Sequence, residues 1–250
     1  MKENISVVYI TKNAQRKLEQ SLLSICFADE IVIVDSGSTD QTLEIAKKYS
    51  AKIIHQEWLG FGKQKQFAVD KAQNDWVLCL DDDEIVSKEL SDNIQNVLKH
   101  PQYMAYQFAR SNYFINRFLK HGEGYPDYSL RLFNKKYAHW SEDNVHEYIV
   151  CHKKVETLKG DLLHYSCDSL EEYLNKQNQY TSIQADILSK QKNIGSLKII
   201  MSPFFRFIKF YFIKRGFLDG LPGFIHILIG CFNSMIKYAK VYEQQKGKKE

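Results

Sequence analysis

The stretch "WVLCLDDDEIV", residues 76–86, decides the fold of this chain. Its first five residues are apolar, a run of the length expected for one buried strand of a parallel sheet. The run ends abruptly in four acidic residues, Asp81, Asp82, Asp83 and Glu84. Carboxylates held side by side repel one another, so a folded chain needs a reason to hold them together. The stretch predicts a buried strand that ends either in a solvated acidic turn before a helix or, because Asp81 follows directly on the buried strand, at a cation site.

Strand-like and helix-like stretches alternate on both sides of this segment. Short β-rich runs are expected at 5–10, 30–34, 51–55 and 75–80, and amphipathic helices at 16–25, 41–49, 63–73 and 88–99. This alternation predicts an α/β fold, a mostly parallel sheet with helices on both faces. Right-handed crossovers then place the carboxyl ends of the strands along one edge, where open α/β sheets bind ligands.

The pattern is less regular from about residue 103 to residue 164. Strands are expected in "MAYQFARSNYF" (104–114) and "YSLRLFN" (128–134). Helical stretches follow at 169–190, roughly 197–214 and 223–244, which predicts a helical extension at the C-terminal end.

Bulk composition excludes few classes of protein. The chain has 250 residues with a formal charge of +4, which does not suggest a nucleic-acid binder. Its five cysteines are odd in number and contain no C-x-x-C pair, so we expect reduced, mostly buried thiols in a cytoplasmic protein. We expect no signal peptide and no transmembrane span, since "GFLDGLPGFIHILIGCF" is interrupted by Asp219, Pro222 and His226.

A second carboxylate loop, "VDSGSTDQT" (34–42), follows the second strand. Asp35 stands at the strand tip, Gly37 permits a tight turn, and Ser38 or Asp40 could cap the next helix. A capped strand-to-helix turn would explain this pattern without any ligand. However, the loop leaves the same predicted edge as the acidic loop, and carboxylates there suit Mg²⁺ or Mn²⁺ held against phosphates.

Several stretches resemble the GT-A glycosyltransferases of family 2. The nucleotide-sugar half of that family is similar to "ISVVYITKN" (5–13), "VDSGSTDQT" and "GFGKQKQFAVDKAQNDWVLCLDDDE" (60–84). Downstream, "YPDYSLRLFNKKYAHWSEDNVHE" (125–147), "LLHYSCDSLEEYLNKQNQY" (162–180) and "KRGFLDGLPG" (214–223) resemble the lipopolysaccharide-core branch related to β-1,4-glucosyltransferases. The resemblance spans nearly the whole chain.

The resemblance implies an inverting hexosyltransferase that uses Mn²⁺ or Mg²⁺. The first candidate for the donor is UDP-glucose, and the first candidate for the acceptor is a heptose of the lipopolysaccharide or lipooligosaccharide inner core. Residues 1–195 would form the GT-A catalytic domain, with 1–110 as its nucleotide-sugar half and 111–195 as its acceptor half. Residues 196–250 would form a helical, membrane-associating extension.

The resemblance also assigns site residues. Those assigned to the nucleotide-sugar are Thr11, Asn13, Asp35, Ser36, Gly37, Lys63, Asp81, Asp82 and Arg131. Asp81 and Asp83 match the family's D-x-D pair, with Asp83 the more direct metal ligand, and His164 in "LLHYS" is a further metal candidate. For Arg131, an ion pair with an acidic loop is an equally good interpretation as phosphate binding.

An inverting transfer needs a carboxylate that takes the proton of the acceptor hydroxyl. Glu147 matches the family's V-H-E motif, and Asp143 is the alternative because other GT-A enzymes place the base in an E-D pair. Asp127 is the next candidate if neither acts. Tyr125 and Trp140 are candidates for stacking on the acceptor sugar.

The segment "SPFFRFIKFYFIKRGF" (202–217) mixes aromatic and aliphatic residues with four cations. This composition fits a helix lying on an anionic membrane surface, and it equally fits a core helix with basic outer residues. A lipid-linked acceptor favours the first, which would place the protein in the cytoplasm, peripheral on the inner membrane.

Three other classes stay open at this level. A nucleotidyltransferase also uses acidic metal ligands on such a sheet, but "ITKNAQRK" lacks the glycines of its usual phosphate loop. A non-catalytic nucleotide-sugar-binding protein would keep Asp35 without needing Glu147. A structural protein of the membrane surface would need neither acidic loop.

Overall fold

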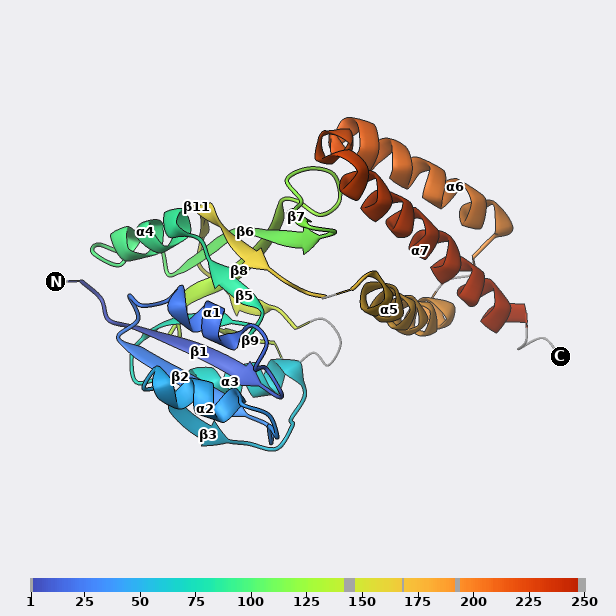
Figure 1. Cartoon of the computed structure of the whole chain (residues 1–250). Coiled ribbons are helices and arrows are strands. Elements are labelled where there is room, and N and C mark those ends of the chain that lie inside the picture. Colours follow the sequence, from blue (N-terminus) through green and yellow to red (C-terminus); the bar gives the residue numbers. More distant parts are fainter. Residues whose placement is uncertain (1, 142–146, 168, 192–193, 247–250) are drawn as a thin grey trace. The chain divides into compact units, whose positions relative to one another are not determined.

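The computed structural model describes residues 2–141, 147–167, 169–191 and 194–246. The chain forms two compact units (Figure 1). The first comprises Met1–Arg110 and Asp127–His164, and the second comprises Ser111–Pro126 and Tyr165–Glu250. Both units are therefore built from two separate segments of the chain.

A nine-stranded sheet in the order β3-β2-β1-β4-β8-β6-β11-β5, with β7 beside β6, organises the first unit. The four strands of the alternating region are parallel: β1 (Ile5–Thr11), β2 (Glu30–Asp35), β3 (Lys52–His55) and β4 (Trp76–Leu80). The β4–β8, β8–β6, β6–β7 and β11–β5 pairings are antiparallel. These strands are β5 (Glu84–Val86), β6 (Ala105–Phe114), β7 (Arg117–Phe118), β8 (Asp127–Asn134) and β11 (Val155–His164).

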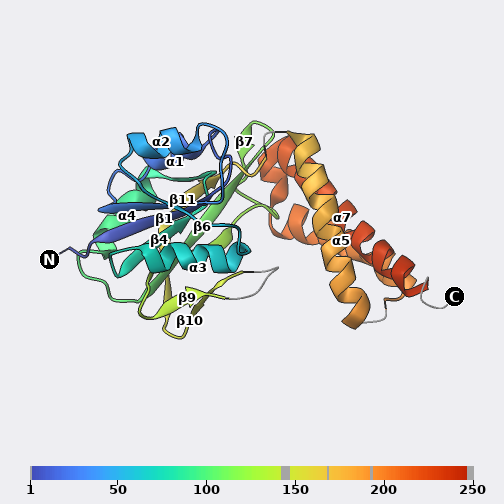
Figure 2. The ribbon, with the colours of Figure 1, turned by 90° about the horizontal axis from the view of Figure 1, so that it is seen from below.

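Helices cover both faces of this sheet, as Figure 2 shows. Strand β1 explains the two layers, because Val7 and Tyr9 point into one core and Val8 into the other. The first core is closed by α1 (Leu18–Leu23), α2 (Thr42–Lys48) and α4 (Lys88–Val97). The second is closed by α3 (Phe61–Lys71) and the pair β9 (Ala138–Trp140) and β10 (Ile149–Cys151). The predicted α/β class is confirmed.

The second unit is mainly helical, which confirms the predicted C-terminal helical extension. It contains α5 (Leu170–Gln191), α6 (Ser196–Phe207), the π-helical segment η1 (Ile208–Ile213), the 3₁₀ turn η2 (Gly216–Asp219) and α7 (Gly220–Lys246). Polar contacts join the helices: Ser202 Oγ lies 2.6 Å from Ser234 Oγ, and Tyr173 Oη lies 3.1 Å from His226 Nε2. Helix α5 thus belongs to the same unit as the C-terminal helices, whereas the division of catalytic roles at residue 195 stays a prediction.

A buried carboxylate explains why residues 111–126 belong to the second unit. Asp219 is 0% exposed. Its Oδ2 accepts hydrogen bonds from the backbone N–H groups of Lys120 (2.9 Å) and His121 (2.8 Å), and its Oδ1 lies 3.3 Å from Arg117 Nη2. A residue about a hundred positions away along the chain therefore fixes the loop after β7.

The segment Gly216–Lys246 is long and apolar enough to cross a membrane by length and composition alone, and 33% of its most apolar window is buried inside the protein. The expectation that polar residues would interrupt it was wrong. Asp219 precedes α7, and Pro222 stands in its first turn, where proline costs no intrahelical hydrogen bond. His226 is accommodated by its contact with Tyr173.

All five cysteines are free thiols. Cys79 and Cys231 are buried, Cys151 and Cys167 are half-buried, and Cys26 is exposed. The expectation of free thiols is met, but the expectation that most of them are buried is not.

Candidate active site

Three predicted residues stand at the carboxyl ends of adjacent parallel strands. Thr11 ends β1 and pairs in register with Asp35 at the end of β2. On the other side of β1, Tyr9 pairs with Leu80, so Asp81 leaves β4 at the same edge. The two carboxylate loops therefore share one edge of the sheet, as the alternation of strands and helices predicts.

Asp35 organises its own loop. Its side chain is 2% exposed and accepts hydrogen bonds from Thr11 Oγ1 (3.0 Å), Gly37 N (2.9 Å) and Ser38 N (2.8 Å). Burial alone would raise the pKa of Asp35, but the hydrogen bonds from Ser38, Thr11 and Gly37 outweigh it and hold the pKa below the ordinary value. The carboxylate thus stays ionised, and its contact with a nucleotide stays a prediction.

The loop after β1 is tied to the Asp35 loop. Asn13 adopts φ +56°, a left-handed conformation that asparagine tolerates, and its backbone N–H donates to Ser38 Oγ at 2.8 Å. In return, Asn13 Oδ1 accepts from Thr39 N at 2.9 Å. Ser36 Oγ accepts from Gln64 Nε2 at 3.0 Å, which joins the same loop to α3. The predicted nucleotide contacts Asn13, Ser36 and Gly37 therefore lie in one cross-linked pair of loops.

Two cations hold Asp81. Its Oδ1 lies 3.0 Å from Lys65 Nζ, and its Oδ2 lies 2.8 Å from an Arg131 guanidinium nitrogen. Burial would raise the pKa of Asp81, but Arg131 and Lys65 hold it far below the ordinary range. The second interpretation of Arg131, an ion pair with the acidic loop, is therefore observed, and phosphate binding by Arg131 stays a prediction.

Lys65 also reaches the candidate base. Its Nζ lies 3.3 Å from Glu147 Oε1, so one ammonium group bridges Asp81 and Glu147. Lys65 is 7% exposed, whereas Lys63, the lysine assigned from the resemblance, is exposed on α3. The sequence held a signal for Lys65, because it stands three and four residues before Ala68 and Val69 on the buried face of the helix.

Glu84, the last acidic residue of the loop, is 0% exposed. Its Oε1 lies 2.9 Å from an Arg131 nitrogen and 3.7 Å from Arg110 Nη1, and its Oε2 accepts from Asp81 N at 2.9 Å. Arg110 in turn pairs with Asp127 at 2.6 Å. The result is a row of alternating charges, which we call the charge row: Asp127, Arg110, Glu84, Arg131, Asp81, Lys65 and Glu147.

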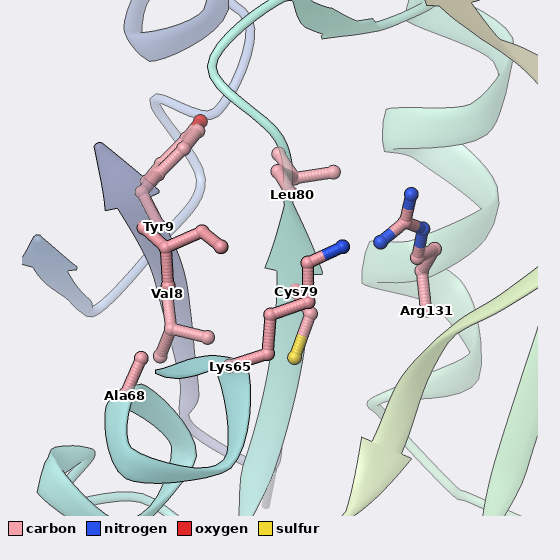
Figure 3. A pocket seen from close by; sticks show the side chains of 8 residues that line it. Val8, Tyr9, Lys65, Ala68, Cys79, Leu80 and Arg131 are labelled. Atoms are coloured by element: carbon pink, nitrogen blue, oxygen red, sulfur yellow. The ribbon is translucent and has the colours of Figure 1, made fainter. Parts of the chain in front are cut away.

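A small pocket opens beside the charge row, and its lining side chains are shown in Figure 3. Lys65 and Arg131 supply its cations, while β1, β4 and Ala68 of α3 supply its apolar walls. Cys79 also lines it, but burial raises the pKa of this thiol to about 12, so the thiol stays neutral and is a poor nucleophile. Within the described part of the chain, Arg131 Nε is buried without a hydrogen-bond partner.

Trp140 contacts two residues that line this pocket, Cys79 and Lys65. It is 5% exposed, its Nε1 donates to Cys79 Sγ at 3.4 Å, and Lys65 Nζ lies 4.8 Å from its ring centroid. The suggestion that Trp140 stacks on the acceptor sugar was therefore wrong, because the ring is part of the core. It supports Lys65 through a cation–π contact instead.

The predicted metal ligands lie where β5 meets β11. Glu84 pairs in register with His164, and His164 Nε2 lies 3.5 Å from Asp83 Oδ2. Neighbouring ligands of an octahedral Mg²⁺ or Mn²⁺ are about 3 Å apart, so these two atoms fit one ion that takes its other ligands from phosphate and water. Among the described residues, no group of three or more His, Cys, Asp or Glu side chains is arranged to hold a metal.

Asp82, between the two predicted ligands, has a raised pKa of about 7. Burial is the main cause, followed by repulsion from Asp83 and Asp81.

The candidate bases differ in what the structure shows of them. Glu147 is described, is partly buried, and contacts Lys65. Asp127 is paired with Arg110. Asp143 lies outside the described residues, as does His146. Of the two main candidates, the geometry therefore describes Glu147 alone, and Lys65 connects it to the acidic loop.

The model of the family described as glycosyl transferase family 2 matches residues 6–154 of this sequence. The chain belongs to glycosyl transferase family 2. An uncharacterised glycosyltransferase of Rickettsia typhi is 35% identical, over 96% of this chain and 87% of the relative. The lipopolysaccharide core biosynthesis glycosyltransferase LpsC of Rhizobium meliloti is 29% identical, over 96% of this chain and 92% of the relative.

Among solved structures, the crystal structure of residues 1–349 of TarS from Staphylococcus aureus is similar to this chain, with 16% identity and a TM-score of 0.48. The similarity covers 98% of this chain and 92% of that TarS fragment. The family assignment confirms that this protein is a glycosyltransferase, as the motifs indicate.

Proposed function

We propose that this family 2 glycosyltransferase moves a hexose from a UDP-sugar, with UDP-glucose as the first candidate, onto a sugar of the lipopolysaccharide inner core. Heptose is the first candidate for the acceptor, and the transfer inverts the anomeric centre. The observation that supports this most directly is Lys65, which bridges Asp81 of the acidic loop and the candidate base Glu147 at 3.0 and 3.3 Å. The acidic loop and the candidate base Glu147 are therefore connected through a single side chain, that of Lys65.

The donor would bind across the shared strand edge. The loops of Asn13 and Asp35 would receive the nucleoside, and Lys65 and Arg131 are the buried cations nearest to the acidic loop that would face the diphosphate. Asp83 and His164 would hold the divalent ion. When bound, Mn²⁺ or Mg²⁺ neutralises the diphosphate and assists its departure.

Glu147 would act as the general base. Its carboxylate lies 3.3 Å from Lys65 Nζ, and that same ammonium group contacts Asp81 of the acidic loop. Asp143 stays the alternative.

The acceptor is proposed from the relatives. LpsC, which is similar to this chain over 96% of its length, is named for lipopolysaccharide core biosynthesis. Family membership favours glycosyl transfer over the nucleotidyl-transfer, non-catalytic and structural alternatives.

A product assay tests the reaction. The protein would be incubated with Mn²⁺, truncated lipopolysaccharide acceptors and a panel of UDP-sugars, and the products read by mass spectrometry. We expect one added hexose from UDP-glucose with a heptose-terminated acceptor. Glu147→Gln should lower turnover by about 10²–10⁴-fold and leave donor affinity near native. If the protein transfers a hexose from none of the UDP-sugars, the proposal is contradicted. If Asp143→Asn is inactive while Glu147→Gln keeps most of its turnover, the general base is Asp143.

We also propose that the second unit rests on an anionic membrane surface. Helix α6 and segment η1 contain no buried residue, although most of their residues are apolar. Their most exposed large side chains are Leu197 (70%), Ile200 (68%), Phe204 (57%), Phe205 (61%), Phe212 (57%) and Ile213 (71%). Lys209, Lys214 and Arg215 are exposed beside them. Apolar groups flanked by cations match an anionic lipid interface.

A further inference from the structure

We propose that Glu84 is a positioning residue of the donor site: its buried carboxylate sets the geometry of the acidic loop before the donor and metal bind. The inference rests on the proposed function, because it concerns the same loop. Glu84 itself touches neither donor nor metal in this proposal. It acts through Asp81 and Arg131.

The contacts of Glu84 reach both the backbone and the side chains of the loop. Its Oε2 accepts from the N–H of Asp81 at 2.9 Å, which closes the loop on itself over three residues. Its Oε1 accepts from Arg131 at 2.9 Å, and the same Arg131 nitrogen bonds Asp81 Oδ2 at 2.8 Å. Glu84 therefore fixes where Asp81 leaves the strand and where the Asp81 carboxylate is held.

The backbone of Glu84 is fixed as well. Its carbonyl oxygen accepts from Ser21 Oγ of α1 at 2.5 Å, and in the β5–β11 pairing it stands opposite His164. The N–H of Glu84 donates to Asp81 O at 3.1 Å. One residue thus links α1, the acidic loop and the strand that ends in the metal candidate His164.

Charge explains why a carboxylate, rather than a neutral acceptor, is needed at this position. Arg131 is 4% exposed and stays ionised, and a buried cation requires carboxylate partners. Glu84 and Asp81 share that task. If Glu84 lost its charge, Arg131 would have Asp81 as its one close carboxylate among the described residues. Arg131 would then hold Asp81 more tightly, and Asp81 would be less available to the donor site.

A purely structural ion pair is the alternative. It would lower the stability of the fold when broken, but folded molecules would bind the donor with native affinity. Donor affinity at a temperature well below unfolding therefore separates the two roles, and stability alone does not.

The test compares Glu84→Gln with Glu30→Gln in the full chain. Glu30 is a matched control: its carboxylate also accepts a backbone N–H, that of Gln73 at 2.7 Å, but it stands at the amino end of β2, away from the acidic loop. Affinity for UDP in Mn²⁺ would be measured by calorimetry, with thermal unfolding recorded for each variant. We expect Glu84→Gln to weaken UDP binding by about 10–100-fold, the usual effect of losing a residue that orients a metal site. Glu30→Gln should change it less than about twofold by the same reasoning.

Native UDP affinity in folded Glu84→Gln, with the wild type binding UDP, would overturn this inference and leave the proposed function intact. Failure of the wild type to bind UDP would overturn both. If Glu84→Gln does not fold, Glu84→Asp decides, since it keeps the charge but cannot reach both partners. A folded Glu84→Asp should lose UDP affinity in the same range, and native affinity would again overturn the inference.

Discussion

Both carboxylate oxygens of Asp81 are engaged by buried cations, Lys65 on one side and Arg131 on the other. A divalent ion would have to compete with these cations for Asp81. Asp83, by contrast, lies beside His164 at 3.5 Å and is the better placed of the two acidic residues to bind metal directly. We therefore propose that the D-x-D pair divides its work, with Asp81 arranging the cations and Asp83 facing the ion.

Lys63 and Lys65 of α3 give a test at this scale. Lys65→Ala leaves Asp81 with one cation and removes the bridge to Glu147. A hydrogen bond between charged groups contributes about 1.5–3 kcal/mol, so we expect UDP affinity to fall by about tenfold or more. Lys63→Ala is the matched control on the same helix and should bind UDP nearly as the wild type does. The measurement is UDP titration calorimetry in Mn²⁺. If Lys65→Ala binds UDP with native affinity and Lys63→Ala binds it more weakly, the result would support Lys63, the lysine assigned from the sequence, as the nucleotide-sugar contact.

Sequence motifs reveal site residues that stand at the ends of predicted strands. They do not reveal site residues whose role depends on being buried in the folded protein. Asp35 ends a strand, Asp81 follows directly on one and Asp83 stands in the same loop, so their common edge could be predicted. The helical spacing of Lys65 indicates the buried face of α3 but does not indicate its partners Asp81 and Glu147. Glu84 looks like an ordinary surface charge in the sequence, because its contacts with Arg131 of β8 and Ser21 of α1 are distant along the chain.

At the scale of elements, strand β11 determines where His164 stands relative to the acidic loop. The strand passes close to α4 at Gly160, which adopts φ +93°. A Cβ atom there would lie 2.4 Å from Leu90 N and 2.7 Å from Leu90 Cα. These are backbone atoms at the start of a helix, so they cannot turn aside as a flexible side chain could.

Gly160→Ala should therefore destabilise the fold. A side chain in this conformation costs about 1–3 kcal/mol, before any displacement of β11 is counted. Gly195→Ala is the control, because no atom of the described residues beyond its chain neighbours lies within 4 Å of a Cβ at that position. Urea unfolding of both variants measures the difference, and equal stability of the two would contradict the close approach of β11 and α4.

The apolar face of α6 and η1 gives the second prediction about elements. The double variant Phe212→Ser with Ile213→Ser should reduce binding to vesicles that contain anionic lipid, since it removes two of the most exposed apolar side chains. Tyr180→Ser, which alters a side chain on α5 that is 57% exposed, serves as the control. Co-sedimentation with vesicles measures binding. Unchanged vesicle binding of the double variant would contradict the proposal that this face binds the membrane surface. If the protein instead stays in membranes through carbonate extraction, α7 spans the membrane.

The long, strongly periodic elements could be predicted from the sequence, and the short ones could not. Strands β1 to β4 and helices α1 to α4 all appear close to the expected positions. β5, β9 and β10 have three residues each, too few for any periodicity to show. β11 is longer, but its mixed polarity hides it. Because β5 and β11 are the strands that bring Glu84 and His164 together, the sequence alone could not predict that pairing.

At the scale of the whole molecule, the described site residues all belong to the first compact unit. This includes His164 at its last position and Glu147 in its second segment. The second unit supplies the apolar face instead. The sequence could not reveal that residues 111–126 join this second unit, because the contact depends on Asp219 about a hundred residues later.

The similarity to relatives extends over the whole molecule as well. The Rickettsia typhi glycosyltransferase and LpsC both match 96% of this chain, so they align with both units. The helical unit is therefore shared with these relatives and is not peculiar to this chain.

We have proposed that the acidic loop and the cations beside it form a metal-dependent UDP-sugar site. Titration of UDP into the full chain by calorimetry tests it most directly, in Mn²⁺, in EDTA, and with Asp83→Asn in Mn²⁺. We predict saturable binding in Mn²⁺, with affinity at least about tenfold weaker in EDTA and in Asp83→Asn, the usual effect of disturbing a metal site. Equal UDP affinity under all three conditions would contradict the metal role, and no UDP binding under any of them would contradict the donor site itself.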